Sequence, residues 1–157
     1  MYHKSKFLLI PYEIYVKIYN DEISKEIEKL QNVAIDVDYV PDTLENPSHW
    51  IYEPDESIAH HRLLLRSNFY PMSRGYWTET SATRSTSPVG WRHHNDFAYP
   101  VNTQDKPKAI AKILAWAATH NVVGIGRWGK WEHMNSDVAV AEALTFVDYL
   151  YTNGAWN

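Results

Sequence analysis

The sequence predicts an α+β fold, with a mostly antiparallel sheet of about five or six strands packed by three helices. Two kinds of pattern support this class: segments in which apolar and polar residues alternate, and segments with apolar residues at helical spacing. The chain has 157 residues, of which 45% are hydrophobic and 22% are charged. We therefore expect one domain over residues 1–157, long enough to form its own core.

The strand prediction is clearest in Asn32–Val40, where apolar and polar residues alternate as in a half-buried strand. Asp36 and Asp38 would share one face of it, spaced like a carboxylate pair, although a solvated strand face is the commoner arrangement. Residues 49–52 and 60–66 flank the turn EPDES and predict a hairpin.

The remaining elements follow from the same two patterns. Alternation and β-branched residues predict strands over 12–19, 76–83 and 122–125, and Pro100 favours an extended segment over 97–101. Apolar residues at helical spacing predict helices over 21–30, 106–120 and 138–151.

Composition excludes several classes of function. A net charge of −4 without a basic stripe argues against nucleic acid as a partner. The absence of Cys excludes disulfides and thiol catalysis. The adjacent histidines at 60–61 and 93–94 would face opposite sides of a strand and could not bind one metal ion together, so we expect no metal site. No apolar run approaches the roughly 20 residues of a membrane span and no signal-peptide pattern opens the chain, so we expect no membrane partner and a cytoplasmic location.

Val122–Ala143 has the densest pattern in the chain. A short apolar strand leads into Gly124, Gly126 and Gly129, and a polar and aromatic loop then leads into a capped helix. A helix start beside Arg127 offers N–H donors and a positive field to an anion or a polar ring. The alternative is that the glycines only form turns and that the tryptophans of the loop pack in the core.

Three segments together resemble a known family. GIGRWGKWEHMNSDVAVAEAL resembles the C-terminal flavin-proximal motif of the superfamily of FAD-dependent amine oxidoreductases, protoporphyrinogen oxidases and UDP-galactopyranose mutases. SHWIYEPDESIAHHRLLLRSNFYP resembles the strand, turn and Arg-bearing strand that lie beside the substrate in that family, and FAYPVNTQDKPKAIAKILAWA resembles its Tyr-Pro-Val segment and following helix. The similarity covers residues 33–150.

This resemblance implies candidate site residues. Arg127 is similar to an Arg that approaches the flavin and the substrate in that family. The helix start at residues 137–139 is similar to a helix start whose backbone amides face the flavin, and Tyr99 is similar to a tyrosine near the substrate. His133 and Asn135 replace a Tyr and an Asp of the mutases, which argues against a nucleotide-sugar substrate, and Trp131 fits the oxidoreductase branch better. The candidate binding residues are Arg62, Arg127, Trp128, Trp131, Asn135, Asp137, Val138 and Ala139.

Arg62 matches an Arg near flavin and substrate in the resembled family, and we expect Arg66 on the same strand face. Because an unpaired Arg on a buried face is costly, each should meet an anion or an acid. Two interpretations of Arg62 and Arg66 have equal weight: they bind a ligand, or they form salt bridges to Asp36 or Glu53.

None of the six glycines forms the GxGxxG turn with which that family holds FAD, so we expect no cofactor on this chain alone and FAD only with a partner. Three hypotheses follow. The chain is a flavin-free isomerase or cyclase of small-metabolite biosynthesis, as a homodimer, with His133, Glu132 and Tyr99 as proton donors and acceptors. Alternatively, it is the substrate-side subunit of a flavoenzyme completed by a separate FAD-binding chain, or an inactive fragment of a longer flavoenzyme.

Overall fold

The structure is a computed structural model that describes residues 6–8, 23–88 and 90–153. It confirms the predicted α+β class and the mostly antiparallel sheet. Contacts group the chain into two compact units: the first contains Met1–Gln31 and Pro100–Asn157, and the second contains Asn32–Tyr99. The single domain expected over 1–157 stays a prediction.

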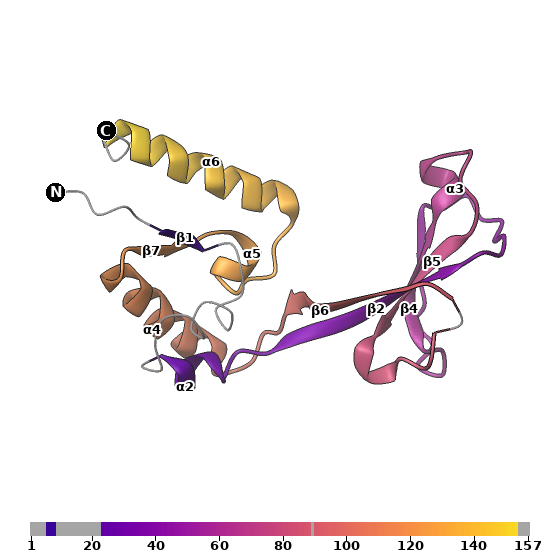
Figure 1. Cartoon of the computed structure of the whole chain (residues 1–157), viewed down its shortest axis with the longest axis horizontal. Coiled ribbons are helices and arrows are strands. Elements are labelled where there is room, and N and C mark those ends of the chain that lie inside the picture. The colour runs from indigo at the N-terminus through magenta and orange to yellow at the C-terminus, as the bar shows by residue number, and fades with distance from the viewer. Residues whose placement is uncertain (1–5, 9–22, 89, 154–157) are drawn as a thin grey trace. The chain divides into compact units, whose positions relative to one another are not determined.

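The second unit is a five-stranded antiparallel sheet with the strand order β3-β4-β5-β2-β6 (Figure 1). Its elements confirm the predicted strand over 32–40 and the predicted hairpin, and they are β2 (Asn32–Val40), β3 (Trp50–Tyr52), β4 (His60–Leu65), α3 (Arg66–Phe69), β5 (Tyr76–Ser81), η1 (Ala82–Arg84) and β6 (Arg92–Pro100).

One detail of the predicted hairpin is wrong. Arg66 was expected on the strand face beside Arg62, but β4 ends at Leu65 and Arg66 opens the one-turn helix α3. The backbone N–H of Tyr70 donates to the carbonyl of Arg66 at 2.9 Å and closes that turn.

The two faces of this sheet differ in chemistry. Directly opposed residues of antiparallel strands project to the same side. Trp50 opposes Leu64, Leu64 opposes Trp77, and Trp77 opposes Tyr39, so one face carries an apolar, largely aromatic row. Along β2 the side chain of Asp38 lies on the opposite face from that of Tyr39. The face with the aromatic row also carries the Arg62–Glu79 ion pair. We call the other face, which carries Asp36 and Asp38, the charged face.

In its described residues, the first unit contains a two-stranded parallel sheet, β1 (Lys6–Leu8) and β7 (Val122–Gly124), and four helices. These are α2 (Ser24–Ile27), α4 (Lys106–Thr119), α5 (Gly126–Gly129) and α6 (Ser136–Thr152). The predicted helices over 106–120 and 138–151 are confirmed as α4 and α6. The helix predicted over 21–30 is only four residues long in the described part of the chain, and the strand predicted over 12–19 lies outside the described residues.

Helix α4 forms the centre of the core of the first unit. Its apolar residues recur at helical spacing and face α2 and β7, where Ala109, Ile113, Trp116 and Ala117 are buried. Pro107 is tolerated at the second position of the helix because no intrahelical acceptor exists there for an N–H group. In the parts of the chain described here, no helix is both long and apolar enough to cross a bilayer.

Candidate functional site

The glycine segment brings the end of β7 against the last helix. Gly126 has a φ of +70°, a left-handed conformation that only glycine adopts without strain. A Cβ placed on Gly126 would lie 3.7 Å from the Cβ of Ala139, in ordinary contact with α6. The turn that follows forms α5, and α5 packs against α6 (Figure 1).

Arg127 lies beside the start of α6, where the sequence placed it. Its guanidinium donates two hydrogen bonds to the carbonyl of Met134, from Nε at 3.2 Å and from Nη2 at 2.7 Å. Met134 is two residues before the first residue of α6. These bonds fix the loop that enters the helix, and a direct role of Arg127 in ligand binding stays a prediction.

Trp131 is a core residue in this structure. Its side chain is fully buried, and its indole N–H donates to the carbonyl of Gln31 at 3.1 Å. Its ring packs edge-on against Trp128, with 5.1 Å between the ring centroids. The φ of +52° at Trp131 is unusual for a residue with a Cβ and is held by this burial. A ligand therefore cannot reach Trp131 without displacing packed groups, whereas Trp128 is half-buried.

The polar candidates lie in the exposed loop and first turn around the start of α6. Glu132, His133, Asn135 and Asp137 are all exposed. Asn135 occupies the N-cap position, but its side chain makes no capping hydrogen bond. Val138 and Ala139 follow in the first turn, Val138 exposed and Ala139 half-buried. The start of the helix is thus open to solvent on the side of these residues.

A groove of about 540 Å³ runs along α6, and we call it the α6 groove. Within it Lys130 and Glu142 form an ion pair at 2.6 Å, and the carboxylate of Glu142 also accepts a 3.4 Å hydrogen bond from the backbone N–H of Gly126. Most of the lining is apolar, and its residues are Val123, Gly124, Ile125, Lys130, Val138, Ala141, Glu142, Thr145, Phe146 and Tyr149. The sequence reading missed this groove, although the positions 138, 141, 142, 145 and 149 repeat with helical spacing.

Helix α6 also exposes a second apolar surface. Among its described residues only Leu150 is buried. The residues at 140, 144, 147 and 151 follow the spacing of one helix face, and their exposed fractions range from 37% to 67%. We call these four residues, Val140, Leu144, Val147 and Tyr151, the outer stripe of α6.

Two further predicted site residues, Arg62 and Tyr99, belong to the second unit. The Nε of Arg62 donates to Glu79 at 2.8 Å, so Arg62 forms a salt bridge, although with neither Asp36 nor Glu53. Burial is the largest single influence on the pKa of Arg62 and lowers it, but the hydrogen bonds to Glu79 and Tyr52 and the charge of Glu79 together outweigh burial, so the pKa is raised. Tyr99 lies near the end of β6, where it is half-buried.

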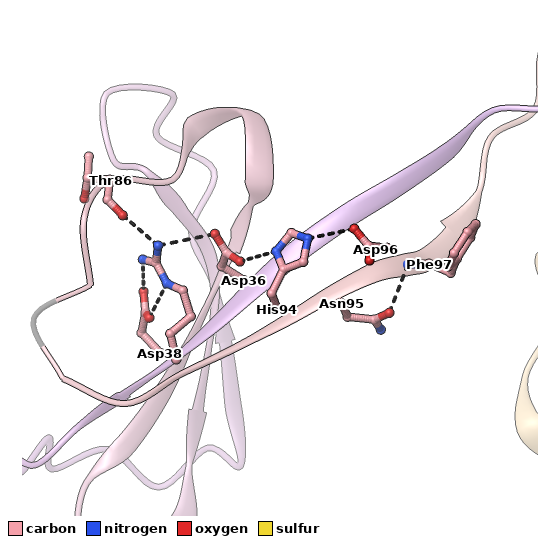
Figure 2. Close-up of polar contacts among 8 residues, drawn as sticks. Asp36, Asp38, Thr86, His94, Asn95, Asp96 and Phe97 are labelled. Atoms are coloured by element: carbon pink, nitrogen blue, oxygen red, sulfur yellow. Dashed lines mark hydrogen bonds and ion pairs between the residues drawn. The ribbon is translucent and has the colours of Figure 1, made fainter.

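Asp36 and Asp38 belong to a charged network on the sheet (Figure 2). Arg92 holds Asp38 through two hydrogen bonds of 2.6 Å and lies 3.4 Å from Asp36, and the ring of His94 contacts Asp36 at 2.6 Å and Asp96 at 2.9 Å. Asp36 is 5% exposed, so the interpretation of this side of β2 as a solvated face is wrong for Asp36. Its partners neutralise its charge where water cannot.

The same contacts shift two pKa values in opposite directions. The hydroxyl of Ser85 is the largest cause that lowers the pKa of Asp36, and His94 and Arg92 add to it against the effect of burial. The pKa of His94 is raised, mainly by Asp36 and then by Asp96. No cluster of His, Asp and Glu that could hold a metal ion occurs in the described part of the chain.

This fold also occurs in a solved enzyme. The chain is similar to the crystal structure of reduced UDP-galactopyranose mutase, with a TM-score of 0.61 and 14% sequence identity. The match covers 80% of this chain but only 36% of the mutase chain. No family model matches the sequence, and no curated protein does.

The similarity to the mutase is one of fold. It shows that the fold of this chain occurs within the mutase, and nothing in it concerns activity. The chain spans little more than a third of the mutase, so most of the mutase architecture has no counterpart in these 157 residues.

Proposed function

We propose that this chain is the substrate-side part of a flavoprotein, and that an FAD-binding part from outside these 157 residues completes it. The outer stripe of α6 would be the surface that this part covers. The observation that carries the proposal is the contrast between the apolar composition of α6 and its exposure.

The outer stripe needs a partner for a physical reason. Burial of apolar surface contributes about 25 cal/mol per Å², and stable folded chains seldom leave a continuous apolar row of this kind in water. Leu144 is 61% exposed and Val140 is 58% exposed, and they lie one turn apart on the same face. A helix that is apolar on several faces is typical of the interior of a larger assembly.

The mutase similarity indicates what that partner would be. The mutase chain is nearly three times as long as the part matched here, and the chain analysed has no GxGxxG turn. The missing portion of such an architecture is therefore the portion that binds the dinucleotide. This makes an FAD-binding part a more specific occupant of the outer stripe than a second copy of the chain.

The start of α6 is the place where the flavin ring would bind in this proposal. Asn135 does not cap the helix with its side chain, which leaves N–H groups of the first turn to other acceptors, and the side chain at Ala139 is small. Bound there, FAD would supply the redox or covalent chemistry that side chains cannot supply. His133 and Glu132 would then hold or move protons, and Arg127 would keep the entry loop in place.

A flavin-free isomerase or cyclase is less well supported. Such an enzyme needs its proton-transfer groups to converge on a site that excludes water. Glu132 and His133 are exposed, and neither lines the α6 groove.

The test is purification of the tagged chain from its natural host, with mass spectrometry of the proteins that accompany it and an absorption spectrum for flavin. We expect a partner that carries FAD and that is lost when Leu144→Asp places a charge in the outer stripe. Ala115→Asp, at an exposed position of α4, is the matched control and should retain the partner.

A colourless homodimer that Leu144→Asp dissociates would contradict the proposal and favour the flavin-free enzyme. A colourless monomer with no flavin-carrying partner would favour an inactive fragment.

A further inference from the structure

A second hollow, of about 300 Å³, lies in the second unit where β4 passes into α3. Its wall combines one cation with aromatic and aliphatic side chains and the hydroxyl groups of one tyrosine and one serine. The lining residues are Leu64, Arg66, Phe69, Tyr70, Ser73 and Trp77. All six residues belong to the second unit, whereas the α6 groove belongs to the first.

Arg66 is the group in this wall that points to a ligand. Its guanidinium carbon lies 5.5 Å from the ring centroid of Trp77 and 5.6 Å from that of Tyr39, so it stacks on the aromatic row of the sheet. Arg62 and Arg92, on the same sheet, each form ion pairs with carboxylates. Across residues 23–88 and 90–153, no ion pair of Arg66 with a carboxylate is found.

The hydrogen bonding of Arg66 leaves capacity for an anion. Its Nη1 donates to the carbonyl of Arg74 at 3.3 Å, beyond the usual N–H···O range. A guanidinium carries five N–H donors in a planar fork that matches carboxylate and phosphate oxygens. The aromatic rings behind it hold the charge in place without neutralising it.

The rest of the wall suits an aromatic ring. Phe69 is 55% exposed and Tyr70 is 63% exposed, so both present apolar surface that a ligand could cover. The hydroxyl of Ser73 already donates to the carbonyl of Tyr70 at 2.8 Å, which leaves Arg66 as the main polar anchor. A hollow of 300 Å³ is at the small end of ligand sites and matches a single ring rather than a dinucleotide.

We propose that this hollow, the Arg66 pocket, binds a small aryl anion: one aromatic ring that bears a carboxylate or a phosphate. The anion pairs with the guanidinium of Arg66, and the ring packs against Phe69 and Trp77. This site is independent of FAD and of the outer stripe of α6, so each proposal can fail without the other.

The test is titration of the purified chain with four probes, followed by ligand-observed NMR and by backbone amide shifts. Benzoate and phenyl phosphate carry both features, whereas benzyl alcohol lacks the charge and inorganic phosphate lacks the ring. We expect the aryl anions to bind at least about tenfold more tightly than either control, with shifts at Arg66 and Phe69. The ratio of benzoate to phenyl phosphate affinity identifies the preferred anion.

Variants separate the two contributions. Arg66→Met keeps an apolar stem and should weaken the aryl anions about tenfold while leaving benzyl alcohol unchanged. Phe69→Ala should weaken the aryl anions and benzyl alcohol alike. Lys108→Met removes one positive charge from an exposed position of α4 and is the control for net charge.

Two results would overturn the Arg66 pocket. One is binding of benzoate and phenyl phosphate no tighter than that of benzyl alcohol. The other is unchanged aryl-anion affinity in an Arg66→Met or Phe69→Ala chain with native circular dichroism.

Discussion

Trp131 in the first unit and Asp36 in the second are both almost completely buried, but their surroundings differ. Trp131 packs among apolar side chains, with a single hydrogen bond from its indole N–H to a carbonyl. Asp36 is surrounded by charges, with His94 at 2.6 Å and Arg92 at 3.4 Å. Apolar packing therefore stabilises the described core of the first unit, whereas ion pairs stabilise the charged face of the second.

The comparison extends to the surfaces. The first unit exposes an apolar helix face, and the second exposes aromatic rings beside an Arg. A continuous aliphatic stripe is suited to another protein part, whereas a small pocket with one cation is suited to a small charged ligand. Each unit thus has a binding surface suited to a different kind of partner.

The largest effect is expected for Trp131→Ala. The change removes a fully buried indole and leaves a cavity. The carbonyl of Gln31 loses one of its two hydrogen bonds and keeps the one from the backbone N–H of Val101. We expect a loss of about 3–5 kcal/mol in the free energy of unfolding of the first unit, measured by urea denaturation. A loss below about 1 kcal/mol would contradict the assignment of Trp131 to the core.

Arg92→Met should have the next largest effect, and it should act on the second unit. Removal of the guanidinium leaves Asp38 without its two 2.6 Å hydrogen bonds and leaves Asp36 with less compensation. We expect a loss of stability in the second unit, read as faster hydrogen exchange of the β2 amides. Lys108→Met is the control, and equal losses in the two variants would show that the network contributes nothing specific.

The charged face should also make the stability of the second unit depend on pH. The pKa of His94 is higher in the folded chain than in the unfolded chain, where it is near 6.5. The contribution of His94 to the stability of the folded state is therefore fully present below pH 6.5, and it is lost as the pH rises through the folded-state pKa. The pKa of Asp36 is lower in the folded chain than in the unfolded chain, where it is near 3.8. The contribution of Asp36 to the stability of the folded state is therefore present above pH 3.8, and it is lost as the pH falls through the folded-state pKa.

The stability of the second unit should therefore be greatest between about pH 4 and pH 6.5. Hydrogen exchange of β2 and β6 amides from pH 5 to pH 8.5 measures the alkaline side. In His94→Gln the loss above pH 6.5 should disappear. If stability depends on pH in the same way in the unchanged chain and in His94→Gln, His94 is not the source of the loss above pH 6.5.

The smallest effect is expected on the outer stripe. Leu144→Ala, at a position that is 61% exposed, should change the free energy of unfolding of the isolated chain by less than about 0.5 kcal/mol. Ile113→Ala, at a fully buried position of α4, should cost about 2–5 kcal/mol. Similar losses for the two would mean that α6 is already covered within the chain.

The periodic segments of the fold could be predicted from the sequence. The helical spacing of residues 106–120 corresponds to α4, which buries one face. The alternation of Asn32–Val40 corresponds to β2, although burial there does not alternate, since the neighbouring Ile35 and Asp36 are both buried. The helix over 21–30 was predicted too long, since Ile23, Ile27 and Leu30 are all buried but only four residues form the helix. Spacing alone does not reveal where the chain leaves a helix.

The sites were less predictable because they depend on long-range partners. Arg127 and the start of α6 are close in sequence, and the glycine pattern was enough to place them together. The Arg62–Glu79 and Asp36–His94 pairs join residues 17 and 58 positions apart, so their partners depend on strand order. The α6 groove and the Arg66 pocket are shaped by several elements and could be located only from the structure.

Hydrogen exchange of α6 tests the central claim most directly, with the isolated chain compared with the chain bound to its FAD-carrying partner. We predict that the amides of α6 exchange much faster than those of α4 in the isolated chain, because one of the two helices is covered and the other is not. In the complex, α6 should become as slow as α4. Equally slow exchange of both helices in the isolated chain would contradict the account.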